Sequence, residues 1–266
     1  MRAPDKVASV NYLEPILAST RRRVDELRSW TRDDALEQRV ASLPKPRGFT
    51  DVLDCPGTSI VAEIKRVSPA KGPLDEDLNA ADLASAYDAG GAVALSIVTE
   101  PDHFKGSLED LRAAASVGLP LLRKDFILDE LQVLESRAWG SDAVLLIVRA
   151  LGEELGALIA AVEALGMEAL VEVHDEAELE RALSAGATLV GVNHRNLETF
   201  EVDPERTLKL GPLLPEGCVL IALSGVSDRA GVEALEAAGA HGLLIGESLV
   251  TAADPAAKLR ELRGER

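Results

Sequence analysis

The stretch Ile60 to Gly72 reads I-V-A-E-I-K-R-V-S-P-A-K-G. It begins with alternating β-branched residues, which are typical of a strand, and Ser68-Pro69 ends it in a loop. Side chains two positions apart on a strand share a face, so Glu63 and Lys65 point the same way. A carboxylate and an amine are therefore expected together at the carboxyl end of a strand. Alone, such a pair is also what an ordinary surface ion pair looks like.

From Ile60 onward, eight apolar strand patterns alternate with helical patterns at intervals of roughly 20 to 32 residues, as parallel βα units require. They are I-V-A-E-I (60–64), A-V-A-L-S-I-V (92–98), L-P-L-L-R (119–123), A-V-L-L-I-V (143–148), E-A-L-V-E-V (168–173), T-L-V-G-V (188–192), V-L-I-A-L (219–223) and G-L-L-I-G (242–246). No G-x-G-x-x-G turn follows the first strand, which disfavours an open doubly wound sheet. The pattern predicts an α/β protein with a closed (β/α)8 TIM barrel.

Two helical patterns precede the barrel, one over about Val10 to Trp30 and a shorter one near Asp33 to Ser42. Pro44 to Gly48 ends the second. We therefore expect residues 1–58 to form a helical extension packed on a single barrel domain of residues 59–266.

The composition argues against several classes of function. A formal charge of -17 over 266 residues argues against a nucleic-acid partner, and no apolar run approaches the roughly 20 residues of a membrane helix. The N-terminus lacks a signal-peptide pattern, and the isolated Cys55 and Cys218 have no metal spacing, so a reduced, cytoplasmic location is expected. No oligomeric state is implied. An anionic substrate would need a local cationic cluster, which we expect from Lys65, Lys71, Lys105, Lys124, Arg149 and Arg195 at the top of the barrel.

Three strings resemble one family: E-I-K-R-V-S-P at 63–69, L-R-K-D-F at 122–126 and G-V-N-H-R-N-L at 191–197. Together they resemble the indole-3-glycerol phosphate synthases, barrel enzymes of tryptophan biosynthesis that carry an N-terminal helical extension. The resemblance implies conversion of 1-(2-carboxyphenylamino)-1-deoxyribulose 5-phosphate, a phosphorylated small molecule, to indole-3-glycerol phosphate, carbon dioxide and water. It implies neither a metal nor an organic cofactor.

Active sites of such barrels lie at the carboxyl ends of the strands. By the resemblance, Lys124 is the general acid, and Glu172, Glu63 and Lys65 complete the catalytic set. A lysine that loses hydration near other cations can exchange a proton near neutral pH. Glu172 ends its strand on the interior face, where a carboxylate without a polar partner would be costly to bury.

Further positions are implied to bind the substrate. Phe104 lies in a loop that resembles the family's F-x-G-S turn, whose ring contacts the anthranilate ring, and Phe126 ends the L-R-K-D-F string. Ser68, Asn193 and Arg195 complete this set, and arginine suits a carboxylate because of its two-pronged donor geometry. The phosphate is expected at Ser224, Gly225, Gly246 and, through its backbone N–H, Glu247, because small residues after strands seven and eight commonly cradle phosphate.

Two positions differ from the family pattern, and several other residues are not expected to take part in catalysis. Leu223 stands where the family usually has a glutamate before Ser-Gly, and Ala70 replaces the serine usual after Ser-Pro. We expect Leu223 to point into the barrel mouth, Arg123 to face the helix layer, and His174 to point outward. None of the four histidines has a triad-like context, so histidine catalysis is not expected.

Other activities remain open from the sequence. A phosphoribosylanthranilate isomerase would share the barrel and the phosphate turns, but it would not call for the E-x-K-x-x-S-P and L-R-K-D-F strings. A catalytically degenerate barrel that binds a phosphate sugar is consistent with Leu223. Another decarboxylating barrel acting on a related anion is the third alternative.

Overall fold

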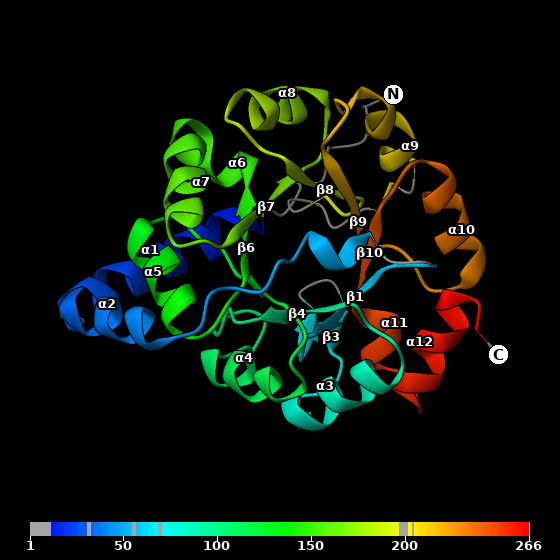
Figure 1. Ribbon diagram of the computed structural model, residues 1–266, viewed down its shortest axis with the longest axis horizontal. Coiled ribbons are helices and arrows are strands. Elements are labelled where there is room, and N and C mark those ends of the chain that lie inside the picture. The colour runs from blue at the N-terminus through cyan, green and yellow to red at the C-terminus, as the bar shows by residue number, and fades with distance from the viewer. Residues whose placement is uncertain are drawn as a thin grey trace, which may run out of the picture.

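A computed structural model describes residues 12–30, 33–54, 57–68, 71–196, 202–203 and 205–265. Eight parallel strands close into a barrel in the order β1-β4-β5-β6-β7-β8-β9-β10, which confirms the predicted (β/α)8 architecture (Figure 1). The strands are β1 Ile60–Ile64, β4 Ala94–Val98, β5 Leu121–Lys124, β6 Ala143–Ile147, β7 Glu168–Val173, β8 Leu189–Asn193, β9 Val219–Leu223 and β10 Gly242–Ile245. The short β2 Val67–Ser68 and β3 Gly72–Pro73 pair antiparallel in the loop after β1.

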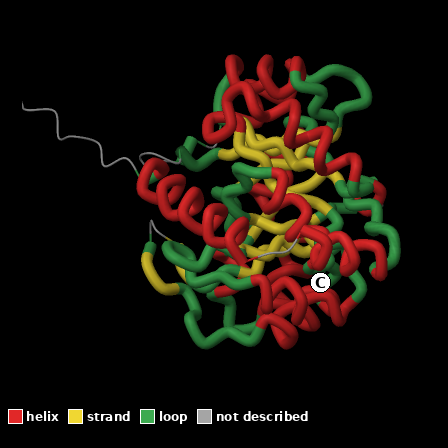
Figure 2. Tube along the Cα trace, turned by 90° about the vertical axis from the view of Figure 1, so that its left-hand side faces the viewer, coloured by secondary structure: helices red, strands yellow, loops and turns green. Residues whose placement is uncertain are grey.

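Helices surround the strands, and Figure 2 shows the strands enclosed by them. Those between and after the strands are α3 Ala80–Ala89, α4 Leu108–Ala114, α5 Glu130–Ala138, α6 Val148–Leu151, α7 Leu155–Ala164, α8 Glu176–Ser184, α9 Arg206–Leu210, α10 Arg229–Ala237, α11 Glu247–Val250 and α12 Pro255–Arg263. Most begin at an Asp, Asn or Ser side chain that caps free backbone N–H groups, as Asp129 does for α5 and Asp175 for α8. Among the described helices, none is long and apolar enough to cross a membrane.

Strand alternation divides the core into two layers. Val61 packs inside the barrel with Leu122, Leu170 and Ile221. Its neighbours Ile60, Ala62 and Ile64 instead pack outward against the helices. The expected faces of β1 are thus confirmed, and Glu63 follows Val61 toward the interior at the carboxyl end.

The segment before β1 wraps the barrel. Helix α1 Leu13–Trp30 lies beside α5, as Figure 1 shows, and α2 Asp33–Ser42 packs on α5 as well. Beyond α2, Phe49 is fully buried at the amino ends of the strands, and its backbone N–H donates to Glu168 Oε1 at 2.5 Å. The expected helical extension is therefore present and packed. Its expected start at Val10, and Pro69-Ala70 of the Ser-Pro loop, lie outside the described residues.

Candidate active site

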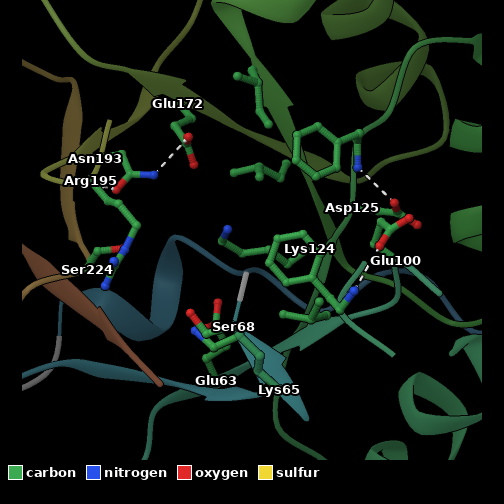
Figure 3. A pocket seen from close by; sticks show the side chains of 15 residues that line it. Glu63, Lys65, Ser68, Glu100, Lys124, Asp125, Glu172, Asn193, Arg195 and Ser224 are labelled. Atoms are coloured by element: carbon green, nitrogen blue, oxygen red, sulfur yellow. Dashed lines mark hydrogen bonds and ion pairs between the residues drawn. The ribbon is translucent and has the colours of Figure 1, made fainter. Parts of the chain in front are cut away.

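A cavity with about 660 Å³ of empty space opens at the carboxyl ends of the strands. Its lining side chains come from seven of the eight barrel strands or the loops that follow them (Figure 3). They are Glu63, Lys65, Ser68, Val98, Glu100, Phe104, Lys124, Asp125, Phe126, Leu145, Ile147, Glu172, Asn193, Arg195 and Ser224. The structure therefore gathers in one cavity all the side chains expected to act in catalysis or to bind the substrate.

Glu63 and Lys65 form a close pair at the end of β1. Nζ of Lys65 donates to Oε1 of Glu63 at 2.6 Å, and the two side chains are 17% and 5% exposed. Burial alone would raise the pKa of Glu63, but the cations of Lys65, Lys124 and Arg195 outweigh it and hold the pKa below its ordinary value. Glu63 is therefore an ionised carboxylate at neutral pH.

Lys124 is the last residue of β5, and Figure 3 shows its amine between Glu172 on one side and Glu63 on the other. Within the described residues, no carboxylate lies within ion-pair distance of its Nζ, in contrast to Lys65. Arg123, one position earlier, points the opposite way and bonds Glu135 and Ser136 of α5 at 2.8 and 3.0 Å, as expected. The strand thus presents to the cavity an amine that forms no ion pair with a described carboxylate.

Glu172 occupies the wall opposite Glu63, at the end of β7. Its Oε1 accepts a bond of 2.9 Å from Nδ2 of Asn193, while its Oε2 is buried without a hydrogen-bond partner among the described residues. The expectation that His174 points outward is wrong. Residues 170, 172 and 174 occupy every second position, so their side chains point to the same side, and Nε2 of His174 lies 3.4 Å from Oε1 of Glu172.

Apolar side chains form another wall. The rings of Phe104 and Phe126 lie 6.3 Å apart at a 40° angle, close to Leu145 and Ile147 in the cavity lining. This arrangement suits an aromatic ring of a ligand, which gains from tilted or offset contact with other rings.

A second hollow adjoins the cavity after β9 and β10 and shares Glu63, Lys65, Arg195 and Ser224 with it. Gly225, Gly246 and Glu247 also line it, so all four expected phosphate positions surround this space. Ser224 has a φ of 68°, an uncommon conformation for a residue other than glycine and one that clusters at functional sites. The Glu247 carboxylate is held by Lys71 and lies 3.7 Å from Arg195.

The expected cationic cluster is only partly correct. Lys65, Lys124 and Arg195 line the cavity, and Lys71 lines the second hollow. Arg149 does not, because the chain turns into α6 directly after β6, and its Nε bonds Glu178 Oε1 at 2.8 Å. Lys105 lies exposed in the loop after β4 and lines neither space.

Leu223 lies deeper in the barrel than expected. It faces the barrel interior, as its register predicts, but it is 1% exposed and is not part of the cavity lining. A Cβ atom on Gly191 would lie 2.7 Å from Leu223 Cδ1, so the leucine fills the space that the glycine leaves. It therefore packs with Leu170 in the layer below the cavity.

Two carboxylates of the cavity were not anticipated from the sequence. Glu100 follows β4, and its Oε2 accepts the backbone N–H groups of His103 and Phe104 at 2.7 and 3.0 Å, which fixes the Phe104 loop. Asp125 lies 3.4 Å from Arg23 of α1, and the same guanidinium is 3.5 Å from Glu100. Helix α1 thus connects the loop that carries Phe104 with Asp125, the residue directly after Lys124. The sequence signal was available, since Asp125 directly follows β5 and Glu100 lies two residues after the end of β4.

Comparison with known proteins identifies the family of this site. Residues 13–262 match the family model described as indole-3-glycerol phosphate synthase. The chain belongs to the indole-3-glycerol phosphate synthase family. Membership confirms the resemblance drawn from the strand-end strings, and with it the expected class of enzyme, a decarboxylating lyase of tryptophan biosynthesis.

Relatives cover nearly the whole chain. The indole-3-glycerol phosphate synthase of Parafrankia sp. is 49% identical over 248 residues, which are 92% of each chain. That of Mycolicibacterium gilvum is 45% identical over 258 residues, covering 96% of this chain and 95% of the relative. Among solved structures, a 3-hexulose-6-phosphate synthase has a TM-score of 0.61 at 20% identity, covering 78% of this chain and 99% of that one. The structural likeness concerns the fold alone.

Proposed function

We propose that the chain cyclises 1-(2-carboxyphenylamino)-1-deoxyribulose 5-phosphate to indole-3-glycerol phosphate with loss of carbon dioxide and water. The observation that carries the proposal is the amine of Lys124, set between the carboxylates of Glu172 and Glu63 in one cavity. Family membership at 49% identity to a synthase supports the same reaction. We further propose that the enzyme works in the cytoplasm, without a nucleic-acid partner, metal or organic cofactor, since the acid and base groups of the cavity cover the required proton transfers.

The substrate's three parts have complementary surroundings in this proposal. The aromatic ring lies against Phe104 and Phe126, and its carboxylate binds Arg195 and Asn193. Ser68 contacts the sugar chain from the loop after β1. The phosphate binds in the second hollow, through the turns that contain Ser224, Gly225, Gly246 and Glu247.

Proton transfers are then assigned by charge. The ring carbon attacks the substrate carbonyl while Lys124 delivers a proton to the carbonyl oxygen. Carbon dioxide leaves, and the electron pair of the broken bond restores the aromatic ring. Lys65 next protonates the departing hydroxyl, and a carboxylate, Glu172 or Glu63, removes a proton to complete the dehydration. We favour Glu172 as this base, because the Lys65 cation lowers the pKa of Glu63 against the effect of burial and so weakens it as a base, whereas Oε2 of Glu172 has no hydrogen-bond partner among the described residues.

Indole fluorescence tests the proposed function directly. The purified protein is given the carboxyphenylamino substrate and, separately, phosphoribosylanthranilate. We expect the indole signal to rise with the first substrate only, together with one equivalent of carbon dioxide. Isomerisation of the second substrate would indicate an isomerase, and tight binding of the first without turnover would indicate a degenerate barrel.

A further inference from the structure

His174 lies directly behind Glu172, in a part of the site that the proposed mechanism leaves unused. It follows β7, and its Nε2 comes within 3.4 Å of Glu172 Oε1. Both side chains are 1% exposed. Water screens neither group, so the charge on the imidazole ring bears directly on the charge and orientation of Glu172.

The first turn of α8 holds the other edge of the ring. Nδ1 of His174 lies 3.0 Å from Oε2 of Glu178, and the same oxygen accepts the backbone N–H of His174 at 2.8 Å. Oε1 of Glu178 accepts from Nε of Arg149 at 2.8 Å. Burial alone would raise the pKa of Glu178, but the bonds and charges of His174 and Arg149 outweigh it and hold the pKa below its ordinary value. Glu178 is thus an anionic acceptor, and Nδ1 carries a proton toward it.

The opposite nitrogen faces a second acceptor. Nε2 of His174 is buried without a hydrogen-bond partner among the described residues, and Glu172 Oε1 beside it already accepts from Asn193. A neutral ring, protonated at Nδ1, would leave the unprotonated Nε2 3.4 Å from a carboxylate oxygen in a region of low dielectric, which is costly. A second ring proton, on Nε2, makes the same contact attractive.

We propose that His174 is a positioning residue for Glu172: its ring carries a proton on each nitrogen, holds Glu172 Oε1 through Nε2, and leaves Oε2 as the ionised oxygen that faces the substrate. The inference rests on the proposed role of Glu172 as a base. Carboxylates flank the ring from β7 (Glu172) and α8 (Glu178), while the guanidinium of Arg149 lies beyond Glu178. Asn193, from β8, approaches Glu172 without adding charge. Two acids therefore face one imidazolium.

Nitrogen NMR of the substrate-free protein tests the charge on the ring without depending on the reaction. At about pH 8 an ordinary histidine is neutral and its two ring nitrogens give distinct resonances. We expect His174 to show two protonated ring nitrogens at this pH, with its signals assigned by their loss in His174→Asn. His241 is the matched control, since its Nδ1 accepts the backbone N–H of Leu220 at 3.1 Å, and it should be neutral. A neutral His174 ring in the folded protein would overturn the proposal.

Kinetics test the effect on Glu172. In His174→Asn, the shorter amide retains a donor toward Glu178 but does not reach Glu172. We expect kcat to fall by about tenfold or more with KM changed by less than about threefold, and the acid limb of the kcat profile to move to higher pH. His241→Asn should leave the profile unchanged. A folded His174→Asn protein with the wild-type profile would show that the ring serves only to anchor the first turn of α8.

Glu178→Gln provides a second route if His174→Asn does not fold. It keeps the shape of the anchor and removes its charge, so the ring should lose its second proton at about pH 8. Retention of the charged ring in this variant would overturn the role given to Glu178. A wild-type protein that forms no indole product would refute the proposed function and the catalytic consequence, while the NMR spectrum would still decide the state of the ring.

Discussion

Nζ of Lys65 lies 2.6 Å from Oε1 of Glu63, and the two residues occupy alternate positions at the end of β1. This pair sets the charge of the lower cavity wall in Figure 3, because Lys65 is the largest of the influences that lower the pKa of Glu63 against its burial. The same pair accounts for the E-x-K spacing in the sequence, since residues two apart along a strand share a face and adjacent residues do not.

Replacing Lys65 with Met should raise the pKa of Glu63. In the wild type the pKa of Glu63 is lowered, so Glu63 stays ionised as the pH falls until this lowered pKa is reached. Without the Lys65 cation, the upward effect of burial is less opposed, and Glu63 should take up its proton at a higher pH. Carbon NMR of the Glu63 carboxyl against pH measures this shift, with Lys65→Arg as the charge-preserving control. An unchanged titration would show that Lys124 and Arg195 suffice.

Gly246→Ala should disturb Glu63 from the other side. A Cβ atom at position 246 would lie 2.5 Å from Glu63 Oε1 and 3.0 Å from Glu63 Cβ. Displacing a catalytic group by about 1 Å can cost about 100-fold in rate, so we expect kcat/KM to fall by at least about tenfold. Gly156→Ala in α7 is the matched control, with nothing within 4 Å of the new atom. Equal kinetics of the two variants would contradict this packing.

Asp125→Asn should lower stability in a pH-dependent manner. Burial alone would raise the pKa of Asp125, but Arg123, Arg23 and hydrogen bonds from Thr99 and Phe126 hold it below the ordinary value. A carboxylate with a lowered folded-state pKa stabilises the fold above its unfolded value of about 3.9 and loses that contribution as the pH falls through the folded value. The wild type should therefore melt at a higher temperature than the variant near neutral pH, and the difference should shrink below about pH 4. A constant difference in Tm at all pH values would contradict the ionic origin of the effect.

Leu223→Glu is expected to increase kcat/KM. The leucine offers no hydrogen bond at a position where the family resemblance implies a glutamate, and a glutamate whose carboxylate reaches up into the cavity would add a bond to a charged group worth about 1.5–3 kcal/mol, or roughly one to two orders of magnitude in rate. The gain should come with a lower Tm. Leu223 fills the apolar space beside Gly191, and a glutamate that turns toward the cavity would leave this space empty. Steady-state kinetics and thermal unfolding measure both effects. An unchanged or lower kcat/KM in folded protein would indicate that the site has adapted to leucine.

Strand alternation and the family resemblance together made most of the candidate site predictable from the sequence. Alternation placed Glu63 and Lys65 on one face and assigned Arg123 to the helix layer, while the L-R-K-D-F string singled out Lys124 by resemblance. The inferences from alternation hold because they depend on the backbone of one strand alone. Alternation along β7 also predicts that His174 points to the same side as Glu172.

What the sequence did not predict depends on contacts between segments. Arg149 leaves the mouth because the chain turns into α6 immediately after β6, where the alternation stops. The depth of Leu223 depends on Gly191 in the neighbouring strand, which has no side chain to hold it higher. The link from Arg23 to Asp125 joins α1 to a loop 102 residues later, and no local pattern records it.

A single-turnover experiment with Lys124→Ala tests the central claim most directly. The variant is mixed in excess with the carboxyphenylamino substrate, and indole fluorescence and carbon dioxide are followed together, with Lys45→Ala, an exposed lysine ahead of the barrel, as the control. General acid catalysis contributes about 100- to 10,000-fold, so ring closure should slow by at least about 100-fold while substrate affinity stays within about tenfold. Turnover above about a tenth of the wild-type rate would remove Lys124 from the mechanism.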